Sequence, residues 1–123
     1  MFKTYLIIAL SFISFVVVAS EIEIPHLLQK GNAEAGADLV ATCAACHGAA
    51  GQSINSDWPN LAGQNQRYLA DQLKYYQQSE RESPLMGAVI PYLKTLSDKQ
   101  LLDIAAFYNS QPLIIGRAKN NQE

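Results

Sequence analysis

Both cysteines of this 123-residue chain and one of its two histidines stand within five consecutive residues, Cys43-Ala44-Ala45-Cys46-His47. In a helical turn, side chains three and four positions apart point to the same side. Cys43, Cys46 and His47 can therefore all face one flat ligand. Cys-x-x-Cys-His is the spacing of a c-type haem attachment site. We therefore expect one covalent haem c, with thioether bonds from Cys43 and Cys46 and with His47 as an axial ligand of the iron.

The first twenty residues have the composition of a secretory signal peptide. Lys3 precedes an apolar run from Tyr5 to Ala19, and no acidic residue interrupts it. As a helix this run would cover ~22 Å, which is less than the ~30 Å hydrocarbon core of a membrane. The length favours cleavage after Ser20 over an uncleaved membrane anchor, which remains the alternative. We predict a signal peptide over 1–20 and a periplasmic domain over 21–123.

Export would place the two thiols in an oxidising compartment, where a bare Cys-x-x-Cys normally becomes a disulfide. Covalent attachment of haem would use both thiols. Residues 21–123 suffice for one small domain with a modest core, and a buried porphyrin would add apolar contact. The sequence contains no internal repeat and no linker long enough to separate two domains, so we expect a single domain.

The predicted mature chain is acidic. Without Lys3 it has eight Lys and Arg against eleven Asp and Glu, a formal charge of −3. This charge argues against non-specific nucleic-acid binding, which depends on a basic surface. It favours a redox partner whose docking face is positive or neutral.

Helical periodicity predicts the first two helices. One covers 33–46, with Asn32 as its N-cap and an end near Gly48, where glycine can take a left-handed conformation. The next covers 65–78 and is amphipathic. Its apolar stripe consists of Leu69, Leu73 and Tyr76.

A third helix is predicted over 98–110, because Ser97 and Gln100 form a capping-box pattern before an apolar face. That face consists of Leu101, Ile104, Ala105 and Tyr108. The Gly- and Pro-containing stretches 48–64 and 79–91 read as loops, with a short helical turn over 92–96. We expect an all-α domain of three to four main helices, with the long loops wrapping the cofactor.

The second axial ligand of the iron can be a protein side chain or an open position. After removal of the predicted leader, the chain contains one methionine, Met86, and one further histidine, His26. Met86 lies 39 residues after His47 in a proline-containing loop, which is long enough to reach the opposite face of the porphyrin. Methionine is often core filler, but this position favours Met86 as the sixth ligand over His26.

The order of motifs adds a family resemblance. They are Gly36 before CAACHG, then Pro59-Asn60-Leu61-Ala62-Gly63-Gln64, Tyr68-Leu69 with Gln72-Leu73, Met86, and Leu96-Ser97-Asp98. In this succession the chain resembles the class I c-type cytochromes, and among them a single domain of the bacterial cytochrome c4 type. Members of that type usually carry two such domains, whereas this chain has one haem motif, so the resemblance is to a monohaem relative.

The resemblance implies a class I cytochrome c fold in which the first and last helices cross closely. Gly36 would allow the close crossing, with Phe107 or Tyr108 as the opposing aromatic residue. The haem would have one exposed edge. The carbonyl of Pro59 would accept a hydrogen bond from the ring of His47 and so support it as a ligand.

Together these features predict an electron carrier and not an enzyme. The haem would cycle between Fe(II) and Fe(III) and pass single electrons between respiratory or periplasmic partners. We expect a monomer that docks transiently, with possible peripheral contact to membrane respiratory complexes. The alternatives are a haem subunit of a periplasmic oxidoreductase or a gas-binding protein with a displaceable Met86, a thiol-disulfide module and, least favoured, a zinc site.

Overall fold

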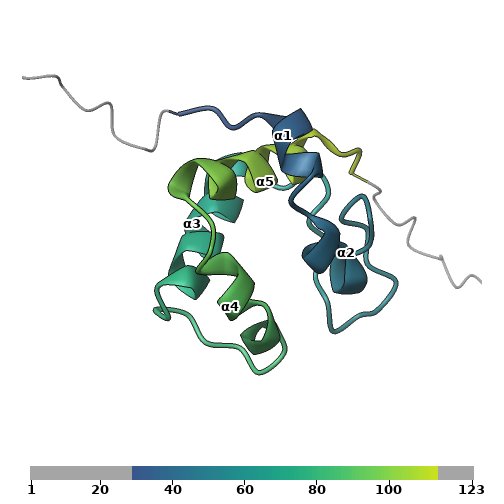
Figure 1. The fold of residues 1–123 in the computed structure, drawn as a ribbon. Coiled ribbons are helices and arrows are strands. Elements are labelled where there is room, and N and C mark those ends of the chain that lie inside the picture. The colour runs from purple at the N-terminus through teal and green to yellow at the C-terminus, as the bar shows by residue number, and fades with distance from the viewer. Residues whose placement is uncertain (1–28, 114–123) are drawn as a thin grey trace, which may run out of the picture.

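The computed structural model of the protein describes residues 29–113. The predicted signal peptide and His26 lie outside this range. The described part is helical and contains no strand, which confirms the all-α class. In chain order, the elements are α1 (Ala33–Ala37), α2 (Ala41–His47), α3 (Gln66–Gln77), the 3-10 turn η2 (Met86–Ala88), α4 (Ile90–Leu93) and α5 (Asp98–Ser110) (Figure 1). None of these helices is long and apolar enough to span a membrane.

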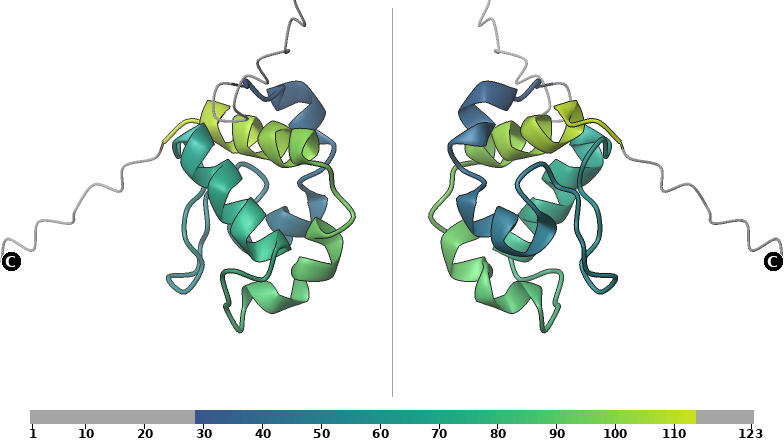
Figure 2. Two further views of the ribbon diagram at one scale, coloured as in Figure 1. Left: turned by 90° about the vertical axis from the view of Figure 1, so that its left-hand side faces the viewer. Right: turned by 90° about the vertical axis from the view of Figure 1, so that its right-hand side faces the viewer.

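Helix α5 is the central element, because it contacts both α1 and α3. Figure 2 shows α1 on one side of α5 and α3 on the other, where α3 runs at a steep angle to α5. The predicted apolar face of α5 is buried, with Leu101, Ile104 and Tyr108 each 1% exposed. Leu93 of α4, which is 0% exposed, belongs to the same core. The stripe read from the sequence therefore points into the interior, as expected for a helix with one apolar face.

The crossing of α1 and α5 places Gly36 against the backbone of Asp103 and the Cβ of Phe107. Phe107 is thus the aromatic residue that opposes Gly36. The Tyr108 ring points elsewhere and packs on Gly51. Asn32 caps α1 as predicted, since its side-chain oxygen accepts a hydrogen bond from the Ala35 N–H at 3.0 Å.

The prediction of one continuous helix over 33–46 is wrong. The helix is broken at residues 38–40, so that α1 packs on α5 while α2 takes its own direction (Figure 1). In an unbroken helix the Leu39 carbonyl would accept a bond from the Cys43 N–H. Here it accepts one from the Tyr92 hydroxyl at 2.7 Å. A side chain 53 residues away therefore satisfies the backbone group that the break exposes.

The other helices lie close to their predicted ranges. Helix α3 is capped by Asn65, and α5 begins with the capping box formed by Ser97 and Gln100. The short helical turn expected over 92–96 is present but begins two residues earlier, because α4 covers Ile90–Leu93 and hydrogen-bonded turns continue to Leu96. Pro91 lies in the first turn of α4, where its missing N–H costs no intrahelical hydrogen bond.

The segment after α2 is a loop, as its composition predicts, and it folds back on itself. The carbonyl of Gly51 accepts hydrogen bonds from the N–H groups of Leu61 at 2.7 Å and Ala62 at 3.0 Å. The Asn60 side chain accepts a further bond from the Ser53 N–H. Gly48 has a φ of 80°, the positive value expected, but its ψ of 154° lies outside the left-handed helical region. These bonds hold the intervening Pro59 in place.

Candidate haem site

A cavity of about 420 Å³ lies between α2 on one side and α3, η2 and α4 on the other. All five residues that the sequence singles out line it: Cys43, Cys46, His47, Pro59 and Met86. They come from three separate segments, namely α2, the loop after it and η2. The volume falls in the range of ~300–1,000 Å³ that is typical of pockets for small molecules and cofactors.

Helix α2 presents Cys43, Cys46 and His47 to the cavity from a single turn and a half. Cys43 is 8% exposed and His47 is 7% exposed, whereas Cys46 lies at the surface. Neither cysteine takes part in a disulfide. The two thiols thus lie at different depths along one wall, one inside the core and one near solvent. This arrangement fits a flat group that is attached along its edge.

The ring of His47 is fixed by a hydrogen bond between its Nδ1 and the Pro59 carbonyl, at 2.8 Å. A carbonyl only accepts, so Nδ1 carries the proton and Nε2 keeps its lone pair. This is the bond that the family resemblance implies. A bond of this kind orients a metal-binding histidine and raises its basicity.

Met86 lines the cavity as the first residue of η2 and is partly buried against the core. Its N–H lies 3.4 Å from the Ser83 hydroxyl, which can accept a weak hydrogen bond. The preceding Leu85 is 60% exposed, so the chain reaches the surface immediately before Met86. Met86 and His47 therefore border the same space from elements that are separated in the sequence and in the fold (Figure 1).

The cavity also includes Tyr108 of α5, which the sequence placed only on the apolar face of its helix. Its hydroxyl is buried and has no hydrogen-bond partner among the described residues. It faces the Cys43 thiol, and burial followed by this neighbour raises the pKa of Tyr108. Burial likewise raises the pKa of the Cys43 thiol. A lone polar atom in an apolar wall suits a cavity whose partner groups arrive with a ligand.

Two charged side chains border the cavity, Arg81 and Asp57. The Arg81 guanidinium lies 4.8 Å from the centre of the Tyr76 ring, within the range of a cation–π contact. The sequence did not single out Arg81, because it stands in a charged stretch that resembles a solvated turn. Only its position in the folded chain places it at the cavity.

The alternatives based on other cysteine chemistry find no support in this arrangement. Within residues 29–113, no group of three His, Cys, Asp or Glu side chains is placed to bind a metal ion. The same residues contain no strand, whereas a thiol-disulfide motif of this kind is expected beside alternating strands and helices. The donor set of two thiols, one oriented imidazole and one thioether instead fits a covalent haem.

An all-helical domain with this motif on the wall of a large apolar cavity defines the class of haem proteins with covalently attached porphyrin. The sequence model of the cytochrome c family matches residues 33–111. The chain belongs to the cytochrome c family, and its cofactor is haem c. Cytochromes c transfer electrons, and this chain shares that general role with its family.

Individual relatives agree with the family model. Cytochrome c-554(548) of Halomonas halodenitrificans is 42% identical over 81 residues, which cover 66% of this chain and 98% of the relative. Cytochrome c4 of Pseudomonas aeruginosa is 42% identical over 91 residues, or 74% of this chain and 44% of the relative. The chain thus spans less than half of the cytochromes c4 that it matches.

A solved structure shows the same relationship. Reduced recombinant cytochrome c4 from Pseudomonas stutzeri superimposes with a TM-score of 0.61 at 41% sequence identity. The match covers 67% of this chain and 46% of the other. The fold is therefore similar to a single domain of the cytochrome c4 type, as the sequence motifs predict.

Proposed function

We propose that this protein is a periplasmic carrier of single electrons with one haem c. Cys43 and Cys46 would form the thioether bonds, and His47 and Met86 would bind the iron from opposite sides. The observation that carries the proposal is that His47 and Met86, the candidate axial ligands, border one cavity from separate elements. The bound haem supplies an iron that cycles between Fe(II) and Fe(III).

The hydrogen bond made by Nδ1 orients His47 to bind the iron through Nε2. The bond from Nδ1 to the Pro59 carbonyl leaves Nε2 as the only nitrogen that can donate a lone pair. Because His47 is 7% exposed, its ring is also held away from bulk water. Pro59 therefore acts as a positioning residue, and it does so through its backbone.

Met86 sets the electronic character of the site. A thioether ligand opposite histidine favours the ferrous state and raises the reduction potential. If His47 and Met86 both bind the iron, it would have no vacant position for a substrate. This supports a carrier and not an enzyme.

We infer the periplasmic location and the kind of redox partner from the sequence. The predicted signal peptide over 1–20 would export the chain, and cytochrome assembly there would use thiols that are otherwise prone to oxidation. The net negative charge suits brief docking of a partner with a positive or neutral face. A monomer is the simplest state that exposes one haem edge to successive partners.

The test is the haem-loaded protein, compared with Met86→Ala and Met86→His. The unaltered protein is expected to show the sulfur-to-iron charge-transfer band at the red end of the ferric spectrum. Met86→Ala should lose this band, lower the potential and bind carbon monoxide readily in the ferrous state. Met86→His should also lose the band and lower the potential, but should keep the iron closed, because histidine restores a sixth ligand.

Two results would contradict the proposal. A spectrum that Met86→Ala leaves unchanged would refute Met86 as a ligand. Ready carbon monoxide binding by the unaltered protein at neutral pH would favour the alternative, a gas-binding protein or a subunit of an oxidoreductase with a displaceable Met86. Haem staining after denaturing electrophoresis separately tests the two thioether bonds.

A further inference from the structure

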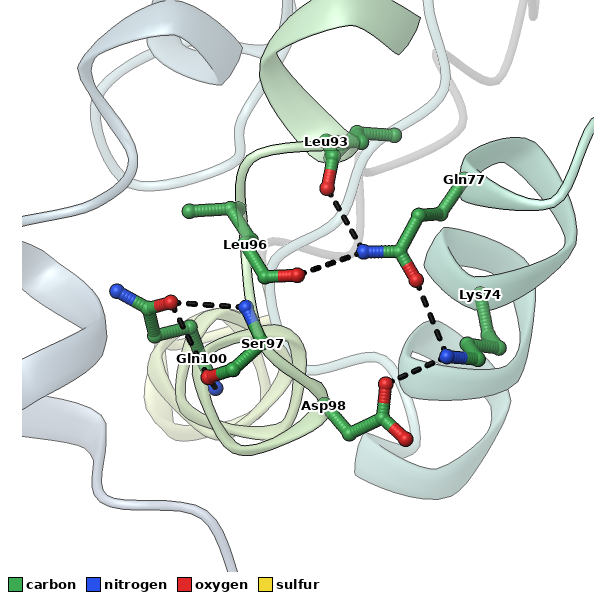
Figure 3. Close-up of polar contacts among 7 residues, drawn as sticks. All are labelled: Lys74, Gln77, Leu93, Leu96, Ser97, Asp98 and Gln100. Carbon is green, nitrogen blue, oxygen red and sulfur yellow. Dashed lines mark hydrogen bonds and ion pairs between the residues drawn. The ribbon is translucent and has the colours of Figure 1, made fainter.

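The carboxamide of Gln77 joins α3 to α4 and to the link between α4 and α5, close in sequence to Met86. Gln77 is the last residue of α3, and its Nε2 donates hydrogen bonds to the carbonyls of Leu93 and Leu96, each at 2.8 Å. Figure 3 shows the amide reaching between these two carbonyls. One side chain thereby binds the last turn of α4 and the residues that lead into α5.

The Leu93 carbonyl lies at the C-terminal end of α4, where intrahelical partners are missing, and Leu96 lies in the link between α4 and α5. The Leu93 carbonyl also accepts a bond from the Leu96 N–H. Among the contacts of residues 29–113, the Leu96 carbonyl accepts only the bond from Gln77. Leu93 is 0% exposed and Leu96 is 9% exposed, so water has little access to replace the amide. Loss of the two donors would leave the buried Leu96 carbonyl unsatisfied, which is costly, and would leave the Leu93 carbonyl with only the bond from the Leu96 N–H.

The amide is itself held in orientation. Its Oε1 accepts a hydrogen bond from Lys74 Nζ at 3.1 Å, and Lys74 also pairs with Asp98 (Figure 3). Because the oxygen is occupied by Lys74, the NH2 group must face Leu93 and Leu96. Asp98 is the first residue of α5, where a negative charge is favourable. The chain of contacts therefore runs without interruption from α5 through α3 to α4.

This connection bears on Met86 because η2 and α4 follow each other almost directly. Met86 begins η2, and α4 ends at Leu93, only seven residues later. The Leu93 N–H binds the Val89 carbonyl, and the Val89 N–H binds that of Met86, so the short helical stretch is internally bonded. Fixing the end of α4 thus fixes where Met86 stands.

Apolar packing against the core also restrains this stretch, but few side-chain hydrogen bonds do. The Tyr92 hydroxyl ties α4 to the Leu39 carbonyl on the far side of the cavity. A Cβ at Gly87 would meet no atom within 4 Å, and Leu85 is 60% exposed. Met86 is therefore bordered by open space, and its placement depends in part on the anchors at the end of α4.

We propose that Gln77, oriented by Lys74, is a positioning residue that holds Met86 at the iron. The inference rests on the proposed function, because it takes Met86 as the sixth ligand. It adds that the strength of this ligation is set by two hydrogen bonds at the far end of α4. Without them α4 would be freer to move, and Met86 would leave the iron more easily.

The test compares Gln77→Glu with Gln78→Glu in the haem-loaded protein. Glutamate keeps the size of glutamine but lacks both N–H donors. Gln78 is exposed and makes no side-chain hydrogen bond among the described residues, so its substitution controls for the added charge. Imidazole is the probe, since it can bind the ferric iron only where Met86 has left. Binding is followed by loss of the charge-transfer band.

We expect Gln77→Glu to bind imidazole on the order of tenfold more tightly than the unaltered protein, since two hydrogen bonds are lost. On raising the pH, the charge-transfer band of Gln77→Glu should also disappear at a lower pH than that of the unaltered protein, because Met86 leaves the iron more easily. Gln78→Glu should change neither quantity. Lys74→Met, which keeps the amide but removes its orienting partner, should shift imidazole binding in the same direction by less. This second variant remains informative if Gln77→Glu does not fold.

A purely structural role would give a different result. If Gln77→Glu lowered the unfolding midpoint while imidazole affinity and the band stayed as in Gln78→Glu, the positioning role would be refuted and Met86 ligation would stand. If the unaltered protein itself lacked the band, the proposed ligation would fail, and this inference with it. The two failures are thus distinguishable.

Discussion

The backbone carbonyl of Asp103 lies so close to Gly36 that a Cβ added at residue 36 would stand 2.0 Å from its oxygen. Real Cβ atoms do not approach a carbonyl oxygen this closely, so α1 and α5 can cross here only because residue 36 has no side chain. The Cβ of Phe107 would lie 3.0 Å away on the same side. This contact fixes α1 to the central helix, next to the break from which α2 departs.

We therefore expect Gly36→Ala to lower the free energy of unfolding by about 1–3 kcal/mol, the usual cost of an overpacked contact. The cost should outweigh the gain in helix propensity from alanine, because the obstacle is backbone and cannot rotate away. Urea unfolding of the haem-loaded protein measures the effect. The control is Gly87→Ala, where the new Cβ would meet nothing within 4 Å. Equal midpoints for the two variants would contradict the prediction.

Asp103 should make stability depend on pH. Asp103 is 5% exposed, and its carboxylate accepts hydrogen bonds from the Asn32 N–H at 2.6 Å and from Lys99. Burial alone would raise the pKa of this carboxyl, but the two donors outweigh it and hold the pKa below its ordinary value. The stabilisation is therefore present above the unfolded-state pKa of about 3.9 and is lost as pH falls through the lower pKa of the folded state.

Asp103→Asn should accordingly unfold at lower urea than the unaltered protein at pH 7, and the difference should shrink as pH falls below about 4. Asp71→Asn provides the comparison. Asp71 pairs with Arg67 at 3.8 Å on an exposed helix face, where an ion pair contributes little. A difference for Asp103→Asn that stayed constant down to pH 2 would show that its charge is not responsible.

The capping box at the start of α5 gives a further prediction about stability, which does not depend on Gly36 or Asp103. The Ser97 hydroxyl accepts from the Gln100 N–H, while the Gln100 side chain accepts from the Ser97 N–H. Ser97→Ala should cost about 1 kcal/mol of stability. Because each side chain satisfies a backbone donor of the other residue, Ser97→Ala and Gln100→Ala together should cost less than the sum of the single changes. Strict additivity in thermal unfolding would show that the two bonds act independently.

The parts of the fold that the sequence predicted depend on neighbours in the chain. The caps at Asn32 and Ser97 involve residues three positions away, and the buried stripe of α5 follows from the helical repeat. The break after α1 was missed because the hydroxyl that satisfies the Leu39 carbonyl comes from Tyr92. The helical periodicity of residues 33–46 contains no information about a hydrogen-bond partner at residue 92.

In the candidate site, too, the sequence predicts some of the residues, and only the folded chain shows the others. Helical spacing alone places Cys43 and His47 on one side of α2, and the scarcity of methionine points to Met86. The bond between His47 and Pro59 was expected from family resemblance, since the eleven intervening residues follow no regular pattern. The contributions of Gln77 and Arg81 depend on contacts between separate elements, so only the folded chain shows them.

Tyr108 offers the last prediction, because its buried hydroxyl has no partner among the described residues although it lines the cavity. Buried polar groups in folded proteins almost always find a partner. We therefore expect that in the haem-loaded protein a group within the filled cavity accepts its hydrogen bond, with the Cys43 sulfur as the nearest candidate. Tyr108→Phe should then lower the unfolding free energy by about 1 kcal/mol.

Whether Tyr108→Phe lowers or raises the unfolding free energy shows whether the Tyr108 hydroxyl has a hydrogen-bond partner in the haem-loaded protein. If the hydroxyl lacked a partner in the loaded protein as well, its removal would relieve an unsatisfied buried group, and Tyr108→Phe would be more stable than the unaltered chain. Tyr75→Phe serves as the control, since Tyr75 is 43% exposed and its hydroxyl can bond to water. Because phenylalanine preserves the ring that packs on Gly51, a loss of stability specific to Tyr108→Phe would come from the hydroxyl and would identify α5 as a polar contributor to the haem pocket.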